Sequence, residues 1–120
     1  MSGMLPPNHT IVETGGKFHL QCMPHDYWMN RGNYWYIYFS LTSIVCHLQA
    51  AATKGATGEV SCSDTYDLSR FSAYRVAYVL MLDVEDVVTT DAGLYVCAQP
   101  PGFHILGELG LIAVVGVVCE

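Results

Sequence analysis

Charged side chains are scarce in this chain: they make up 13% of its 120 residues, and only five are lysine or arginine. A protein that binds nucleic acid needs a cluster of basic side chains, and the sequence has none, so no nucleic-acid partner is expected. The formal net charge of −6 also disfavours anionic membrane surfaces. Apolar residues make up 52% of the chain, which excludes a disordered tail and a coiled coil.

Long apolar runs are also missing. The longest, 105–118, is interrupted by Glu108 and is shorter than the ~20 residues that a membrane-spanning helix needs. Its glycine and valine content favours a buried strand. A chain of 120 residues is long enough for one full core and too short for two.

Motifs that carry chemistry are absent as well. The five histidines, at 9, 19, 25, 47 and 104, lack zinc-ligand spacing, and the cysteines form no CxxC pair. No glycine-rich phosphate loop and no serine elbow is present. We therefore expect no metal, no cofactor and no enzymatic activity.

What the chain does contain is a series of short apolar or alternating runs separated by turn residues, a pattern typical of an all-β fold. Eight or nine such strands in one domain predict a β-sandwich. The expected strands cover 10–14, 17–22, 34–41, 43–48, 59–64, 70–84 (one or two strands), 91–99 and 106–118.

One group of spaced residues is more specific. The most specific stretch begins with the alternating pair Leu82 and Val84, continues with Val87, which is expected to close one end of the core, and ends with Asp91, Gly93, Tyr95 and Cys97. Upstream, Trp35 lies thirteen positions after Cys22, and Arg70 precedes Asp91 by about twenty positions. This set resembles a variable-type (V-set) immunoglobulin domain over nearly the whole chain. The resemblance implies an immunoglobulin-like β-sandwich with Greek-key connections. It also implies a Cys22–Cys97 disulfide packed against Trp35, an Arg70–Asp91 pair, and a Tyr95 hydroxyl bonded to the backbone upstream.

Three further cysteines extend the resemblance. Cys46 and Cys62 lie in the middle of the chain, and Cys119 lies beyond the last expected strand. The pattern resembles the T-cell costimulatory and inhibitory receptors, such as the cytotoxic T-lymphocyte antigen and the inducible costimulator. That likeness implies a second disulfide between Cys46 and Cys62, and a disulfide-linked homodimer through Cys119. The alternative for Cys46 and Cys62 is that both are free and buried as small hydrophobic side chains.

The segment after Cys97 continues the comparison. Receptors of this family carry a proline-rich loop ending in an aromatic residue, and this chain has Gln99, Pro100, Pro101, Gly102 and Phe103 there. In the family the loop contacts a V-set ligand on another cell, so these residues become candidate ligand contacts. The alternative is that the prolines only form a stiff hairpin turn.

Tyrosines supply the other candidate surface. In the strand 34–41, Trp35, Ile37 and Phe39 share one side and are expected in the core, which leaves Tyr34, Tyr36 and Tyr38 facing outward. Tyrosine is enriched at protein interfaces because it combines apolar area with one polar group. The alternative is that these rings only shield the sheet.

Together these features predict one extracellular V-set domain over 1–120, with 117–120 beginning a membrane-proximal stalk and the membrane anchor outside this chain. The number of cysteines and the sequon at Asn8, a glycosylation site, favour a secretory context. The expected function is that of a T-cell costimulatory or inhibitory receptor that binds an immunoglobulin-type ligand on an opposing cell. Alternatives are homophilic adhesion, and a decoy or other variable immune-type receptor.

Overall fold

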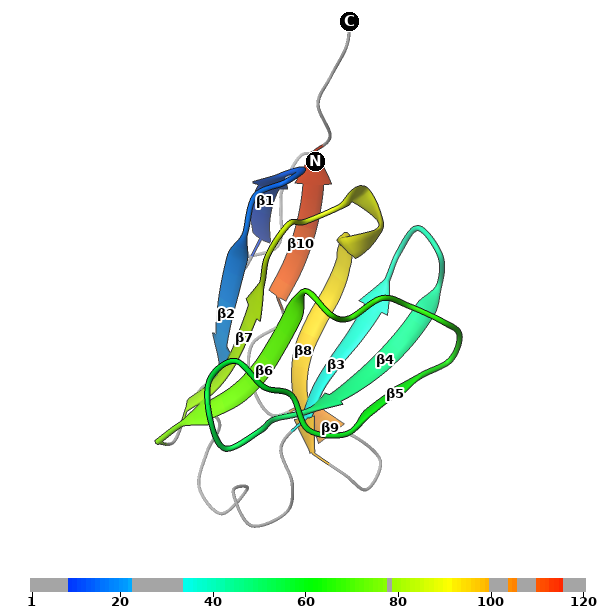
Figure 1. Ribbon diagram of the computed structural model, residues 1–120. Coiled ribbons are helices and arrows are strands. Elements are labelled where there is room, and N and C mark those ends of the chain that lie inside the picture. Colours follow the sequence, from blue (N-terminus) through cyan, green and yellow to red (C-terminus); the bar gives the residue numbers. More distant parts are fainter. Residues whose placement is uncertain (1–8, 23–33, 78, 100–103, 106–109, 116–120) are drawn as a thin grey trace, which may run out of the picture.

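Two β-sheets pack face to face in the computed structural model, which describes residues 9–22, 34–77, 79–99, 104–105 and 110–115 (Figure 1). The larger sheet has the strand order β1-β10-β8-β3-β4-β5, with β9 paired to β8. The smaller sheet has the order β2-β7-β6. The all-β, immunoglobulin-like sandwich expected from the sequence is therefore confirmed.

The strand boundaries follow the alternating runs of the sequence. The larger sheet contains β1 (His9–Glu13), β3 (Tyr34–Phe39), β4 (Ile44–Gln49), β5 (Val60–Cys62), β8 (Gly93–Gln99), β9 (His104–Ile105) and β10 (Gly110–Val115). The smaller sheet contains β2 (Phe18–Cys22), β6 (Phe71–Val76) and β7 (Val79–Val84). A short 3-10 turn, η2 (Thr89–Asp91), leads into β8.

The connections give the sandwich its type. β1 runs parallel to β10, and all other paired strands are antiparallel. β4 and β5 extend the larger sheet beyond β3, and this extension distinguishes the variable-type strand arrangement from the constant type.

Two expected strands need more detail than the sequence provides. The range 70–84 is resolved into β6 and β7, because Ala77 takes a left-handed backbone conformation (φ 52°) and lets the chain reverse there. Of the expected final strand 106–118, the structure describes 110–115, all in β10. The two-residue strand β9 is not anticipated by the sequence pattern.

A disulfide and an indole hold the two sheets together at the centre of the core. Cys22 on β2 is bonded to Cys97 on β8, with the Cα atoms 6.3 Å apart. Trp35 on β3 is 2% exposed, and its Nε1–H donates to the carbonyl oxygen of Met81 on β7, 3.1 Å away. Each of these links joins one sheet to the other.

A buried carboxylate organises one end of the sandwich. Asp91, which is fully buried, accepts two hydrogen bonds from the Arg70 guanidinium, from Nη1 at 2.6 Å and from Nη2 at 2.9 Å. The Tyr66 hydroxyl donates to the same carboxylate at 2.5 Å, and the Tyr95 hydroxyl donates to the Asp91 carbonyl oxygen at 2.6 Å. Burial raises the pKa of Tyr66 to about 12, and hydrogen bonding to Asp91 contributes to the shift. The geometry corresponds to the tyrosine corner and the arginine–aspartate pair that the resemblance implies.

The second disulfide closes the far edge of the larger sheet. Cys46 on β4 lies directly opposite Cys62 on β5, and the structure joins them with the Cα atoms 4.0 Å apart. The loop between β4 and β5 also contacts the other sheet. Ala51 forms a parallel bridge with Tyr74 of β6 and exchanges backbone hydrogen bonds with Ala73 and Arg75. The loop thus ties the edge of the larger sheet to the smaller one.

Candidate protein-binding face

The outward tyrosines of β3 occupy the middle of the larger sheet. The burial pattern along β3 alternates, with Trp35, Ile37 and Phe39 buried in the core. Tyr34 and Tyr36 are half-buried on the other side of the strand, and Tyr38 is exposed. The structure therefore brings these candidate residues together on one surface, as strand alternation requires.

The neighbouring strands complete this surface. Tyr36 lies between Val96 of β8 and His47 of β4, and His47 in turn lies opposite Ser61 of β5. The rings of Tyr36 and His47 are in contact, with their centroids 5.2 Å apart. We call this surface the tyrosine face; its outward residues with described side chains are Tyr34, Tyr36, Tyr38, Val45, His47, Gln49, Ser61, Leu94 and Val96. Of these, Tyr38 and Ser61 are exposed, Val96 is buried at 3% exposure, and the others are half-buried.

None of these nine side chains carries a formal charge at neutral pH. His47 is the only one that titrates near neutrality, and its burial lowers the pKa of the imidazole below the usual 6.5, so it is neutral at pH 7. The Tyr38 hydroxyl shares a hydrogen bond of 3.3 Å with the Ser43 hydroxyl. The face combines aromatic and aliphatic area with a few hydroxyl, amide and imidazole groups, a composition typical of protein interfaces.

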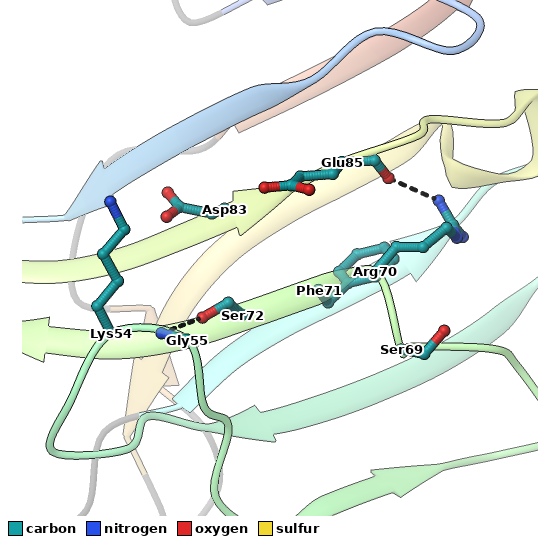
Figure 2. A pocket seen from close by; sticks show the side chains of 8 residues that line it. All are labelled: Lys54, Gly55, Ser69, Arg70, Phe71, Ser72, Asp83 and Glu85. Atoms are coloured by element: carbon teal, nitrogen blue, oxygen red, sulfur yellow. Dashed lines mark hydrogen bonds between the residues drawn. The ribbon is translucent and has the colours of Figure 1, made fainter.

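The outer surface of the smaller sheet carries charged side chains at one end, and Val76, Val79 and Met81 toward the other. Asp83 lies on β7, and Glu85 directly follows this strand. On the neighbouring strand, Lys17 directly precedes β2 and His19 lies on it. Two clefts of about 240 Å³ and 370 Å³ share Lys54, Asp83 and Glu85 in their walls. Figure 2 shows Lys54 reaching from the loop after β4 toward β7, where both carboxylates stand. Within the described residues, no ion pair joins Lys54 to either of them.

The remaining candidates have no described side chains. Gln99 ends β8, and only its backbone is described. Six others fall outside the described residues, together with the stalk segment 117–120: Asn8, Pro100, Pro101, Gly102, Phe103 and Cys119. The contribution of the proline loop, the sequon and the terminal cysteine therefore stays a prediction.

Sequence patterns missed two residues that the structure brings into prominence. His47 is recognisable from the sequence as an outward strand residue, but its contact with Tyr36 depends on the register between β3 and β4. Tyr66 lies in a loop with no periodicity, and nothing in the sequence signals its bond to Asp91. A residue directly across an antiparallel pair can be inferred only when the length of the connecting turn is known.

Comparison with known proteins does not assign a family. No protein-family model matches the chain, and no curated protein matches it. Across the described ranges, no group of three or more histidine, cysteine, aspartate or glutamate side chains is placed to hold a metal ion. In the same part of the chain, no helix has the length and apolar character needed to cross a membrane.

Proposed function

We propose that this chain is the extracellular ligand-binding domain of a T-cell costimulatory or inhibitory cell-surface receptor, and that it recognises an immunoglobulin-type domain on another cell. Binding alone carries this function, and no reaction is involved. The observation that supports it is the tyrosine face, an uncharged aromatic surface on the larger sheet of an immunoglobulin-like sandwich.

The contrast between the two outer surfaces supports this choice of face. An outward sheet face normally carries charged side chains, and the smaller sheet has Asp83 and Glu85 at one end of its outer face. The tyrosine face instead presents three tyrosines in a row on one strand. Tyrosine gives a large rigid contact area at a low cost in conformational entropy, and it dominates the binding energy of many interfaces.

The second disulfide supports the receptor type. The Cys46–Cys62 bond joins β4 to β5 directly behind the tyrosine face and holds the edge strand in register beside His47. A second disulfide in the middle strands is the feature by which the sequence resembles the costimulatory receptors. In this proposal the proline loop after Gln99 extends the binding surface, and Cys119 links two receptors so that avidity strengthens binding between cells.

The proposal is tested by screening the domain against a panel of immunoglobulin-type ectodomains displayed on cells. Tyr36→Ala and Phe103→Ala should each weaken binding to the ectodomain that is found at least about tenfold, because truncated interface aromatics commonly cost that much. Gln21→Ala, on the outer surface of the smaller sheet, is the matched control and should bind like the wild type. Circular dichroism and thermal melting must show that the variants stay folded. Unchanged affinity in both aromatic variants would refute the proposal.

A further inference from the structure

The loop between β4 and β5 has the features of a segment that proteases cut. Its residues 52–56 are all exposed, and alanine, threonine and glycine surround its one lysine, Lys54. Of the alanines in this loop, only Ala50 packs against the hydrophobic core. Gly55 takes a left-handed backbone conformation (φ 89°), which reverses the chain at the loop tip. Exposed loop tips with small and polar residues are preferred sites of proteolytic cleavage.

Side-chain contacts, rather than strand pairing, hold the tip of this loop. The Gly55 N–H donates to the Ser72 hydroxyl on β6 at 3.1 Å (Figure 2), and that hydroxyl donates to the carbonyl oxygen of the next loop residue at 3.2 Å. The backbone anchors lie on either side of the tip. Ala51 is bridged to β6, and the Gly58 N–H donates to the Gln49 carbonyl oxygen at 2.8 Å. The tip can therefore open locally while both anchors and the strands stay in place.

Lys54 meets the requirement of one class of protease. Serine proteases of the trypsin type bind a basic side chain in a pocket that contains an aspartate, and they cut the peptide bond that follows. Lys54 is exposed, and among the described residues it has no ion pair, although Asp83 and Glu85 line the same clefts. Its side chain can therefore enter such a pocket without breaking a salt bridge.

The other basic residues of the described ranges are poorer sites. Lys17 is exposed, but the next residue, Phe18, is buried and begins β2. Arg70 is held in its ion pair with a buried carboxylate, and Arg75 lies within β6. A cut after any of these residues requires a strand or the ion pair to come apart first, whereas a cut after Lys54 requires only the loop tip to move.

A cut in this loop would leave the domain in one piece. Residues 1–54 contain β1 to β4, and residues 55–120 contain β5 to β10. The two segments alternate within both sheets, so four strand pairs join them: β1 with β10, β3 with β8, β4 with β5, and β2 with β7. Both disulfides, Cys22–Cys97 and Cys46–Cys62, also connect one segment to the other. The fragments therefore separate only if both disulfides are reduced and the core is lost.

We propose that Lys54–Gly55 is a processing site at which a trypsin-type serine protease converts this domain into a folded, disulfide-linked two-chain form. Water is added across the bond between the Lys54 carbonyl carbon and the Gly55 nitrogen. This hydrolysis leaves a carboxylate on Lys54 and an ammonium on Gly55, and no oxidant or reductant takes part. The Cys46–Cys62 bond spans the cut and keeps β5 paired with β4, so the tyrosine face persists in the two-chain form.

The test is limited digestion of the folded chain with trypsin, followed by mass spectrometry and gel electrophoresis. An Arg31→Gln background removes the one basic residue outside the described ranges. The expected product is heavier by one water, runs as a single species without reductant, and splits into 1–54 and 55–120 with reductant. Lys54→Gln should lose the cut, and Lys54→Arg should keep it. Lys17→Gln, which removes the same charge from a residue of the same cleft, is the matched control and should be cut like the background chain.

A second variant tests the local opening of the tip. Ser72→Ala removes the hydroxyl that holds the tip to β6. It should speed the cut about fivefold, the factor expected for the loss of one ordinary hydrogen bond when cleavage follows the population of the open loop. An unchanged rate would contradict this route to the cut. The two-chain product should keep the circular dichroism spectrum of the intact chain.

Three results would overturn the inference. One is a folded chain that trypsin leaves intact while it digests the same chain after reduction and unfolding. Another is a first cut that persists in Lys54→Gln, since that cut lies elsewhere. The third is a cut chain that loses its β-sheet circular dichroism signal. None of these results touches the proposed function, which fails only if Tyr36→Ala and Phe103→Ala both retain full affinity for the ectodomain found in the cell-display screen.

Discussion

Removing the Asp91 carboxylate is the most informative perturbation of this fold, because four hydrogen bonds converge on a side chain with no exposed surface. Two come from Arg70 and one from the Tyr66 hydroxyl, and the fourth comes from the Val88 backbone N–H at 2.9 Å. Asp91→Ala leaves a guanidinium that is only 17% exposed without its counter-charge, and it also leaves the Val88 backbone N–H without its acceptor. The Tyr66 hydroxyl loses its bond to the carboxylate but keeps Thr90 Oγ1 as a partner at 3.1 Å.

The cost of Asp91→Ala can be worked out from these contacts. Breaking a buried ion pair by removing one partner costs about 3–5 kcal/mol. Arg70 keeps some contact with water and hydrogen bonds to the carbonyl oxygens of Glu85 and Asp86, which lowers the cost, while the unsatisfied Val88 N–H adds about 1 kcal/mol or more. We expect the free energy of unfolding to fall by about 4 kcal/mol. With a urea m-value of about 2 kcal/mol/M, the unfolding midpoint moves down by about 2 M.

A double-mutant cycle separates the pair from its surroundings. The cycle consists of Arg70→Met, Asp91→Ala and the double variant Arg70→Met/Asp91→Ala. The double variant has no stranded charge, so it should be more stable than Asp91→Ala. The coupling between the two sites should reach about 2 kcal/mol, within the range for residues in one network. Glu85→Ala, at an exposed position of the same end of the sandwich, should change stability by less than about 0.5 kcal/mol.

The assay is urea unfolding followed by tryptophan fluorescence, with Trp35 in the core as the reporter. Additive single effects, or an Asp91→Ala variant within about 1 kcal/mol of the wild type, would refute the reasoning, because either result means that the buried carboxylate and the guanidinium do not depend on each other.

Three further experiments, by urea unfolding or NMR, test the strand packing, the second disulfide and the burial of His47. Gly93→Ala should lower the free energy of unfolding by at least about 3 kcal/mol, since the added Cβ would overlap the carbonyl oxygen of Tyr38 on β3. Gly55→Ala is the control: with φ +89° and nothing within 4 Å of the added Cβ, it should cost only about 1 kcal/mol. Equal costs would contradict the close approach of β8 to β3. Cys46→Ala/Cys62→Ala opens a link with a sequence separation of 16 and should cost about 3 kcal/mol; no loss of stability would mean that the bond is absent. The His47 imidazole, followed by NMR, should titrate below pH 6.5 because burial lowers its pKa. Its contribution to stability is then present above pH 6.5 and is lost as the pH falls through the folded pKa. A midpoint at or above pH 6.5 would contradict this.

Strand alternation, together with the resemblance to V-set domains, was sufficient to predict the centre of the sandwich. Alternation identifies which side of a strand is buried, and Tyr95 two residues before Cys97 marks the turn into β8 regardless of what lies between the strands. These features depend on neighbours in the sequence, so a single sequence reveals them.

Pairings across long connections were harder to predict. Whether Cys46 meets Cys62 depends on the register of β4 and β5, which is set by a loop that detours to β6 through Ala51. A shift of one residue would turn one sulfur away from the core. The contact of His47 with Tyr36 depends in the same way on the turn between β3 and β4, and no local pattern encodes that turn.

The chemistry of the two outer surfaces has one origin, the strict alternation of the strands. On β3 the buried residues are Trp35, Ile37 and Phe39, and on β7 they include Leu82 and Val84, so the two strands contribute to the core in equivalent ways. Their outward residues differ, with three tyrosines on β3 and Val79, Met81 and Asp83 on β7. Since the outward residues add little to the core, the fold leaves them free to vary, and under the proposed function recognition is specified there. The uncharged surface of β3 and its neighbours is therefore the part of this domain where substitutions should change binding without changing the fold.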